Sequence, residues 1–175
     1  MLLPMAFGSI VYPALRLQRN LRRFGTFVAI LVLNALAATS LGLVVSAGTN
    51  SLKAASSLAP VCMVLMLLFG GFYVNAANIP RSLRWLTRAS FVNFSFKALA
   101  LNEFSGLDIP CPSGALDCVR SGEQVLSRLS FQDDTLHQVL LCEATLVAAI
   151  NFLAFVLLRR NMPKFEVMLP PPSEQ

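Results

Sequence analysis

Three long apolar runs constrain this chain more than any other feature of its sequence. They extend from about Phe24 to Ser46, from about Ala54 to Val74 and from about Leu136 to Leu158. The first two runs contain no charged residue, and the third contains a single acid, Glu143. A helix needs roughly 20 apolar residues to cross the hydrocarbon core of a bilayer. The runs therefore predict three full membrane-spanning helices.

The composition agrees with a membrane environment. Hydrophobic residues make up 55% of the 175 residues and charged residues only 13%, whereas roughly a quarter of a soluble domain is charged. One small soluble core cannot hide so much apolar surface, so we expect membrane lipids around the chain. The arginines flank apolar stretches instead of covering a polar face between stacking aromatics. We therefore expect no nucleic-acid partner.

A fourth apolar segment, from Met1 to Leu15, is short and is interrupted by Pro4 and Pro13. It lacks the basic start and the cleavage site of a secretory signal, so we interpret it as the end of a further span. The predicted fold class is an all-α integral membrane bundle of three full spans plus one partial N-terminal span. A proline-rich end, residues 166–175, is expected to be a disordered tail.

The connecting segments predict how the spans are arranged. The short polar turn from Ala47 to Lys53 predicts an antiparallel hairpin of the first two full spans. Two spans separate this turn from the C-terminal tail, so both must lie on the same side of the membrane. Residues 77–135 divide into an amphipathic half and a polar loop that contains Cys111 and Cys118. The amphipathic half predicts short re-entrant or interfacial helices before the last span.

Two rules disagree about orientation. Four of the 14 basic residues lie on the side of the tail and the other ten on the side of the long loop. That count places the long loop in the cytoplasm. Cys111 and Cys118, however, have the spacing and the Pro/Gly-rich setting of a disulfide, which belongs outside the cytosol. The residues alone leave the orientation open.

The segment from Gly70 to Gly106 reads GGFYVNAANIPRSLRWLTRASFVNFSFKALALNEFSG. It resembles the region after the fifth membrane helix of G-subfamily (White) ABC half-transporters. The matching elements include Ile79-Pro80 and Trp85-Leu86, and the strongest joint signal is the motif Asn102-Glu103-Phe104-Ser105-Gly106 that follows them. The similarity continues through Cys111, Cys118 and residues 122–126. It implies a partial membrane domain over residues 1–165, from the end of the third to the sixth family helix.

This resemblance implies the permease part of an ATP-driven exporter of lipids, sterols or amphipathic compounds, located in the plasma membrane or an internal membrane. The tail would then be cytoplasmic and residues 77–135 extracytosolic, with Cys111 and Cys118 joined. Phe72 and Tyr73 occupy the place of a bulky apolar pair that closes the translocation path.

Val64 and Leu67, which share a helix face, would line the cavity beneath that pair. The preceding Gly70-Gly71 is expected to weaken the helix locally. Without the resemblance, Phe72 and Tyr73 are interpreted as an interfacial aromatic belt.

The nucleotide-binding domain of such exporters is absent from this sequence. There is no Gly-x-x-x-x-Gly-Lys-Ser/Thr loop, so we expect this chain to bind no cofactor and to be no enzyme by itself. ATP and Mg²⁺ would be bound by a nucleotide-binding domain in a full-length protein or in trans, and a second half-transporter would complete a homo- or heterodimer. Lys97 stands where the family usually has an acid. A different class of function stays open: a free-standing four-span scaffold or adaptor without transport activity.

A few polar residues interrupt the apolar runs. Glu143 lies seven residues into the last run, roughly 10 Å below its start, and should face protein or water because an acid is costly in lipid. We favour a structural hydrogen bond there over substrate or proton handling. Asn34 and Asn151 are likewise interpreted as interhelical hydrogen-bond partners. The single histidine, His137, and the cysteines of the apolar runs show no metal-ligand spacing, so neither a metal site nor a catalytic site is predicted.

Overall fold

The computed structural model describes residues 2–18, 20–49, 51–72, 80–108 and 121–161. Regular structure in these ranges is helical, apart from an isolated antiparallel bridge between Asp108 and Ser121. The helices are α1 (Leu2–Ala14), α2 (Leu21–Gly48), α3 (Leu52–Leu68), the 3-10 helix η2 (Arg81–Leu83), α4 (Arg84–Ala89), α5 (Phe91–Phe104), α6 (Gly122–Arg128) and α7 (Leu136–Arg160). The all-helical fold expected from the sequence is confirmed for this part of the chain.

Two of the described helices, α2 with 28 residues and α7 with 25, are long and apolar enough to cross a membrane. The helices α1 and α3 are apolar but shorter. The sequence predicted a span up to Val74, whereas α3 ends at Leu68 after 17 residues. At helical rise those residues extend about 25 Å, which is less than the roughly 30 Å of a bilayer core. Tyr73 and Val74 lie outside the described residues.

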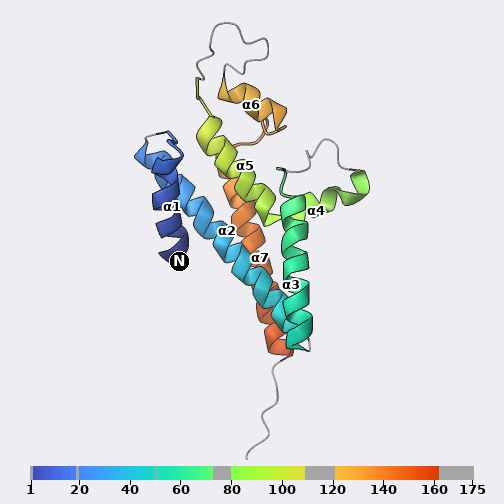
Figure 1. Ribbon diagram of the computed structural model, residues 1–175. Helices are drawn as coiled ribbons and strands as arrows, with labels where there is room; N and C mark the ends of the chain where they lie inside the picture. Colours follow the sequence, from blue (N-terminus) through green and yellow to red (C-terminus); the bar gives the residue numbers. More distant parts are fainter. Residues whose placement is uncertain (1, 19, 50, 73–79, 109–120, 162–175) are drawn as a thin grey trace, which may run out of the picture.

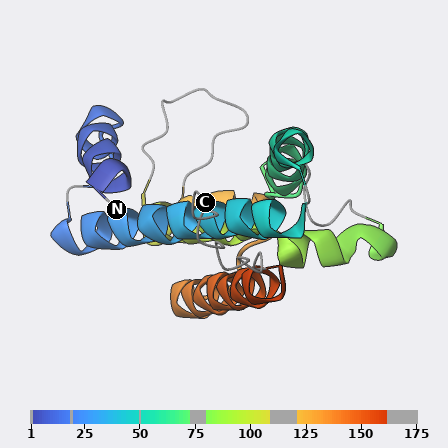
Figure 2. The ribbon, with the colours of Figure 1, turned by 90° about the horizontal axis from the view of Figure 1, so that it is seen from below.

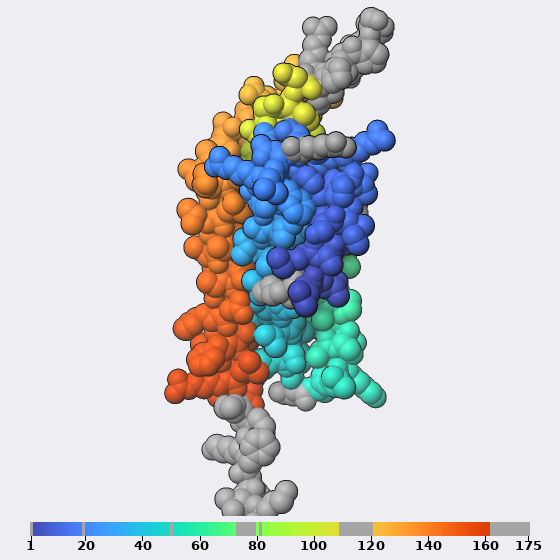
Figure 3. Space-filling model, turned by 90° about the vertical axis from the view of Figure 1, so that its left-hand side faces the viewer, coloured from blue at the N-terminus to red at the C-terminus, as the bar shows by residue number. Residues whose placement is uncertain are grey.

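Helix α2 lies at the centre of the bundle (Figures 1 and 2). Seen from below, α1 and α3 lie on one side of α2 and α7 lies on the other. In the space-filling view, α7 forms one edge of the molecule, and α2 is visible between α7 and α1 (Figure 3). In Figure 1, α2 and α7 run downward, and α3 and α5 run upward. The predicted antiparallel hairpin of α2 and α3 is therefore present.

The turn after α2 and the end of α7 lie at the same end of the bundle, as the sequence predicted. The amide nitrogen of Asn161 donates a hydrogen bond to the carbonyl oxygen of Ala47 at 2.6 Å. This bond joins the last described residue to the end of α2.

Helix α5 supplies much of the core. It packs against both α2 and α7, and half of its 14 residues are buried. Its apolar residues Ala98 and Leu101 cluster with Ile30 of α2 and Val139 of α7. The amphipathic region before the last span is therefore of two kinds: α5 enters the bundle, and α4 remains outside it with Trp85 63% exposed.

Side-chain caps fix where α2, α3 and α5 begin. Asn20, Ser51 and Ser90 each accept a hydrogen bond from a backbone N–H of the first turn that follows, which satisfies a donor that the helix leaves free. Ser90 also donates to the carbonyl oxygen of Met66 at 2.7 Å. This buried hydroxyl therefore joins the last turn of α3 to the first turn of α5.

Candidate functional site

The predicted translocation-path residues of α3 lie on its outer surface. None of the residues of α3 is buried, and Val64 and Leu67 are 56% and 49% exposed. Soluble monomers rarely leave such contiguous apolar surface open. The outer face of α3 is therefore suited to contact with lipid, with another membrane helix or with an apolar ligand.

Leu67 and Phe72 come together where α3 ends. A hollow of about 280 Å³ is lined by Leu67, Gly70, Phe72, Val92 and Phe96. The ring of Phe72 is 70% exposed and meets the Phe96 ring edge-on, with 5.8 Å between the ring centroids. Val64 is not part of this lining, and Tyr73 lies outside the described residues. The structure thus brings together two of the four predicted path residues.

The glycine pair before Phe72 acts differently from what the sequence predicted. It does not loosen a helix, because α3 has already ended at Leu68. Gly71 has a backbone φ of +84°, which favours glycine. A Cβ atom on Gly70 would lie 2.8 Å from a methyl carbon of Val92. The pair therefore forms a tight turn against α5, and this turn presents Phe72 to the hollow.

Glu143 is the last member of a row of hydrogen-bonded polar side chains that connects three helices. Its side chain is fully buried, and its Oε1 accepts a hydrogen bond from Oγ of Ser95 at 2.5 Å. Oγ of Ser95 also lies 3.1 Å from Oδ1 of Asn34. Helices α7, α5 and α2 are joined in this way, and the predicted interhelical roles of Glu143 and Asn34 are present. Oε2 of Glu143 is buried without a hydrogen-bond partner among the described residues.

Sequence reasoning missed Ser95, the residue in the middle of this row. A signal was available in the sequence, because the small or polar residues Ser95, Ala98 and Asn102 follow helical spacing. The structure buries all three. Small and polar residues on one face of a helix are typical of close packing between membrane helices. The side-chain amide of Asn151 donates to the carbonyl oxygen of Val147 in the same helix at 2.9 Å, so its interhelical role stays a prediction.

The motif from Asn102 to Gly106 ends α5 and holds the start of α2. The guanidinium of Arg23 donates to the carbonyl oxygens of Asn102 at 2.6 Å, Glu103 at 3.2 Å and Ser105 at 2.7 Å. Asn102 donates in return to the carbonyl oxygen of Arg23 at 3.1 Å. The last carbonyls of a helix lack partners within it and attract cations. Arg23 therefore caps α5 from another helix.

Glu103 extends this contact to the link before α2. Its Oε1 accepts a hydrogen bond from the backbone N–H of Gln18 at 2.9 Å. The side-chain amide of Gln18 donates to the carbonyl oxygen of Glu103 at 2.8 Å. The motif thus fixes both the first turn of α2 and the chain that leads into it.

The bridge between Asp108 and Ser121 closes the loop that contains both loop cysteines. The backbone N–H of Gly122 donates to Leu107 at 2.7 Å, and a Cβ on Gly122 would collide with the carbonyl oxygen of Phe104. The two ends of the loop are therefore held at the end of α5. Cys111 and Cys118, and the predicted disulfide between them, lie outside the described residues, as does the predicted disordered tail.

Lys97, which departs from the family pattern, has a defined partner. Its Nζ lies 2.7 Å from Oδ2 of Asp134 and 5.1 Å from the centre of the Phe131 ring. Asp134 lies just before α7. The pair therefore attaches the segment that enters α7 to the middle of α5.

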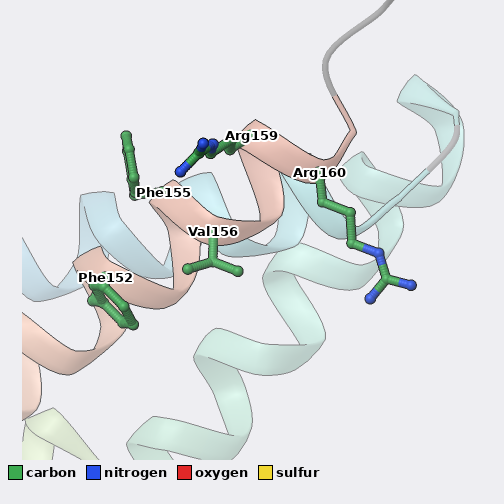
Figure 4. A pocket seen from close by; sticks show the side chains of 5 residues that line it. All are labelled: Phe152, Phe155, Val156, Arg159 and Arg160. Atoms are coloured by element: carbon green, nitrogen blue, oxygen red, sulfur yellow. The ribbon is translucent and has the colours of Figure 1, made fainter.

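The opposite end of α7 combines aromatic and basic side chains. Phe152, Phe155, Val156, Arg159 and Arg160 line a shallow depression on this helix (Figure 4). Arg159 extends along α7 toward Phe155, whereas Arg160 points away from it. Aromatic rings beside basic groups are typical of the membrane–water interface. Over the part of the chain that the structure describes, no group of three or more His, Cys, Asp or Glu side chains is placed to hold a metal ion.

Comparison with known proteins gives these features a context. The sequence profile described as "ABC-2 type transporter" matches residues 1–104. ABC transporter G family member 7 of Arabidopsis thaliana is 37% identical over 93% of this chain and 22% of its own length. Protein white of Drosophila melanogaster is 30% identical over 89% of this chain and 23% of its own length. The rat broad substrate specificity transporter ABCG2 is 35% identical over 63% of this chain.

The chain spans between 18% and 23% of the length of these relatives. The profile covers more than half of the chain, and the relatives extend the similarity through the last helix. The helical fold with two long apolar helices agrees with a membrane domain. The chain therefore belongs to the ABC-2 type transporter family, as a membrane-domain segment with homologues in the G (White) subfamily.

Proposed function

We propose that this chain forms part of the permease of an ATP-driven exporter that moves lipids, sterols or other amphipathic compounds. The observation that carries the proposal is the exposed apolar face of α3, which ends at the hollow between Leu67 and Phe72. Within the described residues this face has no covering element. In a transporter with two membrane domains, it would line the substrate path.

Phe72 and Tyr73 would form the outer closure of that path, with Val64 and Leu67 below it. The tight turn at Gly70 and Gly71 supports this role for Phe72, because it fixes the ring at the end of α3. The T-shaped contact with Phe96 anchors one edge of the ring, and Phe72 is 70% exposed. A constriction made of large apolar side chains gates a pore by excluding water.

The activity would need partners that supply what this sequence lacks. A nucleotide-binding domain, in the same polypeptide or in trans, would bind ATP and Mg²⁺. A second half-transporter would provide the opposite wall of the path. On this arrangement the tail is cytoplasmic and the loop that contains Cys111 and Cys118 is outside the cytosol.

The proposal is tested by asking whether ATP hydrolysis can be separated from substrate export. The sequence is assembled with its nucleotide-binding domain in proteoliposomes, and the ratio of substrate exported to ATP hydrolysed is measured. Replacing both Phe72 and Tyr73 with alanine should lower this ratio while ATP hydrolysis persists. The matched control is Phe155→Ala, which removes an exposed aromatic ring at the other end of the bundle and should leave the ratio unchanged.

Two outcomes would reject the proposal. An unchanged ratio in the double alanine variant would mean that the two rings are interfacial anchors. Failure of the chain to associate with any ATP-binding subunit in native membranes would favour the scaffold or adaptor function instead.

A further inference from the structure

Glu143 is completely enclosed by the protein. It is 0% exposed, and it lies in the third turn of α7, against which both α2 and α5 pack. This enclosure is complete within the described residues, so further membrane helices beside the bundle would not reach the side chain. A carboxyl group in such a place depends on its own bundle for hydrogen bonds and for any counter-charge.

No counter-charge is available to Glu143 among the described residues. Its Oε1 contacts Oγ of Ser95, and its Oε2 has no hydrogen-bond partner. Lys97 on α5 pairs with Asp134 instead, at 2.7 Å. The other titratable side chains of α2, α3, α5 and α7 make no hydrogen bond or ion pair with Glu143: Arg22, Arg23, Lys53, Cys62, Glu103, His137, Cys142, Arg159 and Arg160. A carboxyl group that is buried without a cation takes up a proton.

The hydrogen atoms of the polar row give independent evidence. Oγ of Ser95 has one hydrogen and two oxygen neighbours, Oε1 of Glu143 at 2.5 Å and Oδ1 of Asn34 at 3.1 Å. It can donate to only one of them. If Glu143 is ionised, Ser95 must donate to the carboxylate, and the Asn34 amide has to turn over to present its nitrogen. That arrangement still leaves a buried charge with a single donor.

A proton on Oε1 of Glu143 removes both difficulties. The carboxylic acid then donates to Ser95, and Ser95 donates its own hydrogen to Oδ1 of Asn34. Each of the two contacts has one donor and one acceptor, without a change in the orientation of the amide. Oε2 becomes the carbonyl oxygen of a neutral acid, and an unpaired neutral acceptor costs less free energy than an unpaired charged one.

We propose that Glu143, Ser95 and Asn34 form a buried proton-binding site, in which Glu143 is a neutral carboxylic acid at neutral pH. This site goes beyond the proposed export function and does not depend on it. The proton joins α7 to α5, and through the Ser95 hydroxyl it also sets the direction of the bond from α5 to α2. Loss of the proton would leave a charge between three helices, so ionisation should loosen the bundle.

The test is infrared spectroscopy of the purified full 175-residue chain at neutral pH. A protonated carboxyl group gives a C=O stretching band that is separate from the bands of carboxylates. Glu143→Gln should remove one such band, because glutamine has the same shape and holds no titratable proton. Glu123→Gln, the same change at an exposed glutamate of α6, should leave the band unchanged. Ser95→Ala should keep the band and shift its frequency, because the acid loses its acceptor.

The pH dependence of stability gives a second readout. A glutamate of the unfolded chain is ionised at neutral pH, so folding takes up the proton that Glu143 holds. A folded state that binds the additional proton becomes less stable as the pH rises, by at most about tenfold in the folding equilibrium constant per pH unit. The melting temperature of the wild type should therefore fall relative to that of Glu143→Gln between about pH 5 and about pH 7.

Three results would overturn the proposal. One is an identical carboxylic-acid band in the wild type and in Glu143→Gln, which would mean that Glu143 is ionised. The second is a wild-type melting temperature that does not fall relative to the glutamine variant as the pH rises. The third is failure of Glu143→Gln to fold, because glutamine offers the same donor and acceptor as the neutral acid and should replace it.

Discussion

Replacing Arg23 with methionine should destabilise the bundle far more than the same change at Arg22. The two arginines are neighbours in the first turn of α2. The Arg23 guanidinium donates three hydrogen bonds to the end of α5, whereas the Arg22 side chain is exposed and makes no hydrogen bond to another described residue. Methionine keeps the length and apolar stem of arginine and removes the charge and the donors.

The expected size follows from the three distances. Two of the bonds are short, at 2.6 and 2.7 Å, and the third is 3.2 Å. A hydrogen bond to a charged group contributes roughly 1.5–3 kcal/mol, and partial exposure of Arg23 places each bond at the low end. Counting only the two short bonds, at about 1.5 kcal/mol each, we expect Arg23→Met to lower the free energy of unfolding by about 3 kcal/mol. Arg22→Met should cost less than about 0.5 kcal/mol, as is usual at an exposed position.

The assay is the apparent melting temperature of the purified chain in one detergent. A loss of about 3 kcal/mol corresponds to roughly 6–12 °C for a chain of this size. Arg23→Lys should fall between the wild type and Arg23→Met, since an ammonium keeps the charge but lacks the guanidinium fork. Equal melting temperatures for Arg23→Met and Arg22→Met would refute the idea that Arg23 caps α5.

Three further predictions follow from the same structure and sequence. Non-reducing mass spectrometry of native protein should find Cys111 linked to Cys118, and two alkylatable thiols there would contradict the extracytosolic loop. A tag after Ser113 should be accessible only from outside the cytosol and a tag at Gln175 only from the cytosol; the reverse result would support the count of basic residues. Glu143→Leu should lower stability by about 1–2 kcal/mol because it leaves polar partners buried, and Glu143→Gln should cost less. Equal detergent melting temperatures for these two variants would show that the hydrogen bond is unimportant.

The long apolar helices could be predicted because lipid solvation acts on each residue separately. A continuous run of apolar side chains marks α2 and α7 wherever they pack. The end of α3 could not be predicted in this way, because Phe69 and Phe72 are as apolar as the residues before them. The helix stops where Gly71 adopts a positive φ and Gly70 packs against Val92. That packing is a tertiary contact and leaves no mark in the hydropathy pattern.

The burial of α5 was hidden for a related reason. The basic residues that make the amphipathic region look interfacial, Arg84 and Arg88 among them, belong to α4. The segment that follows carries Lys97 and Glu103, and both have partners elsewhere in the fold. From the sequence alone a charged residue suggests an exposed helix. Once its partner in the fold is known, the same residue is compatible with a buried helix.

Apart from the hydrogen bond between Asn161 and Ala47, the polar contacts described above between the long helices pass through α5. Arg23 of α2 binds its terminal carbonyls, and Asn34 of α2 and Glu143 of α7 meet at Ser95. Lys97 of α5 holds the segment before α7. Without α5, α2 and α7 could still pack through apolar side chains, but their buried polar groups would lose these partners in lipid. The Asn-Glu-Phe motif forms the end of α5. Its role is therefore structural, because α5 is the helix that provides hydrogen-bond partners for the polar groups of α2 and α7.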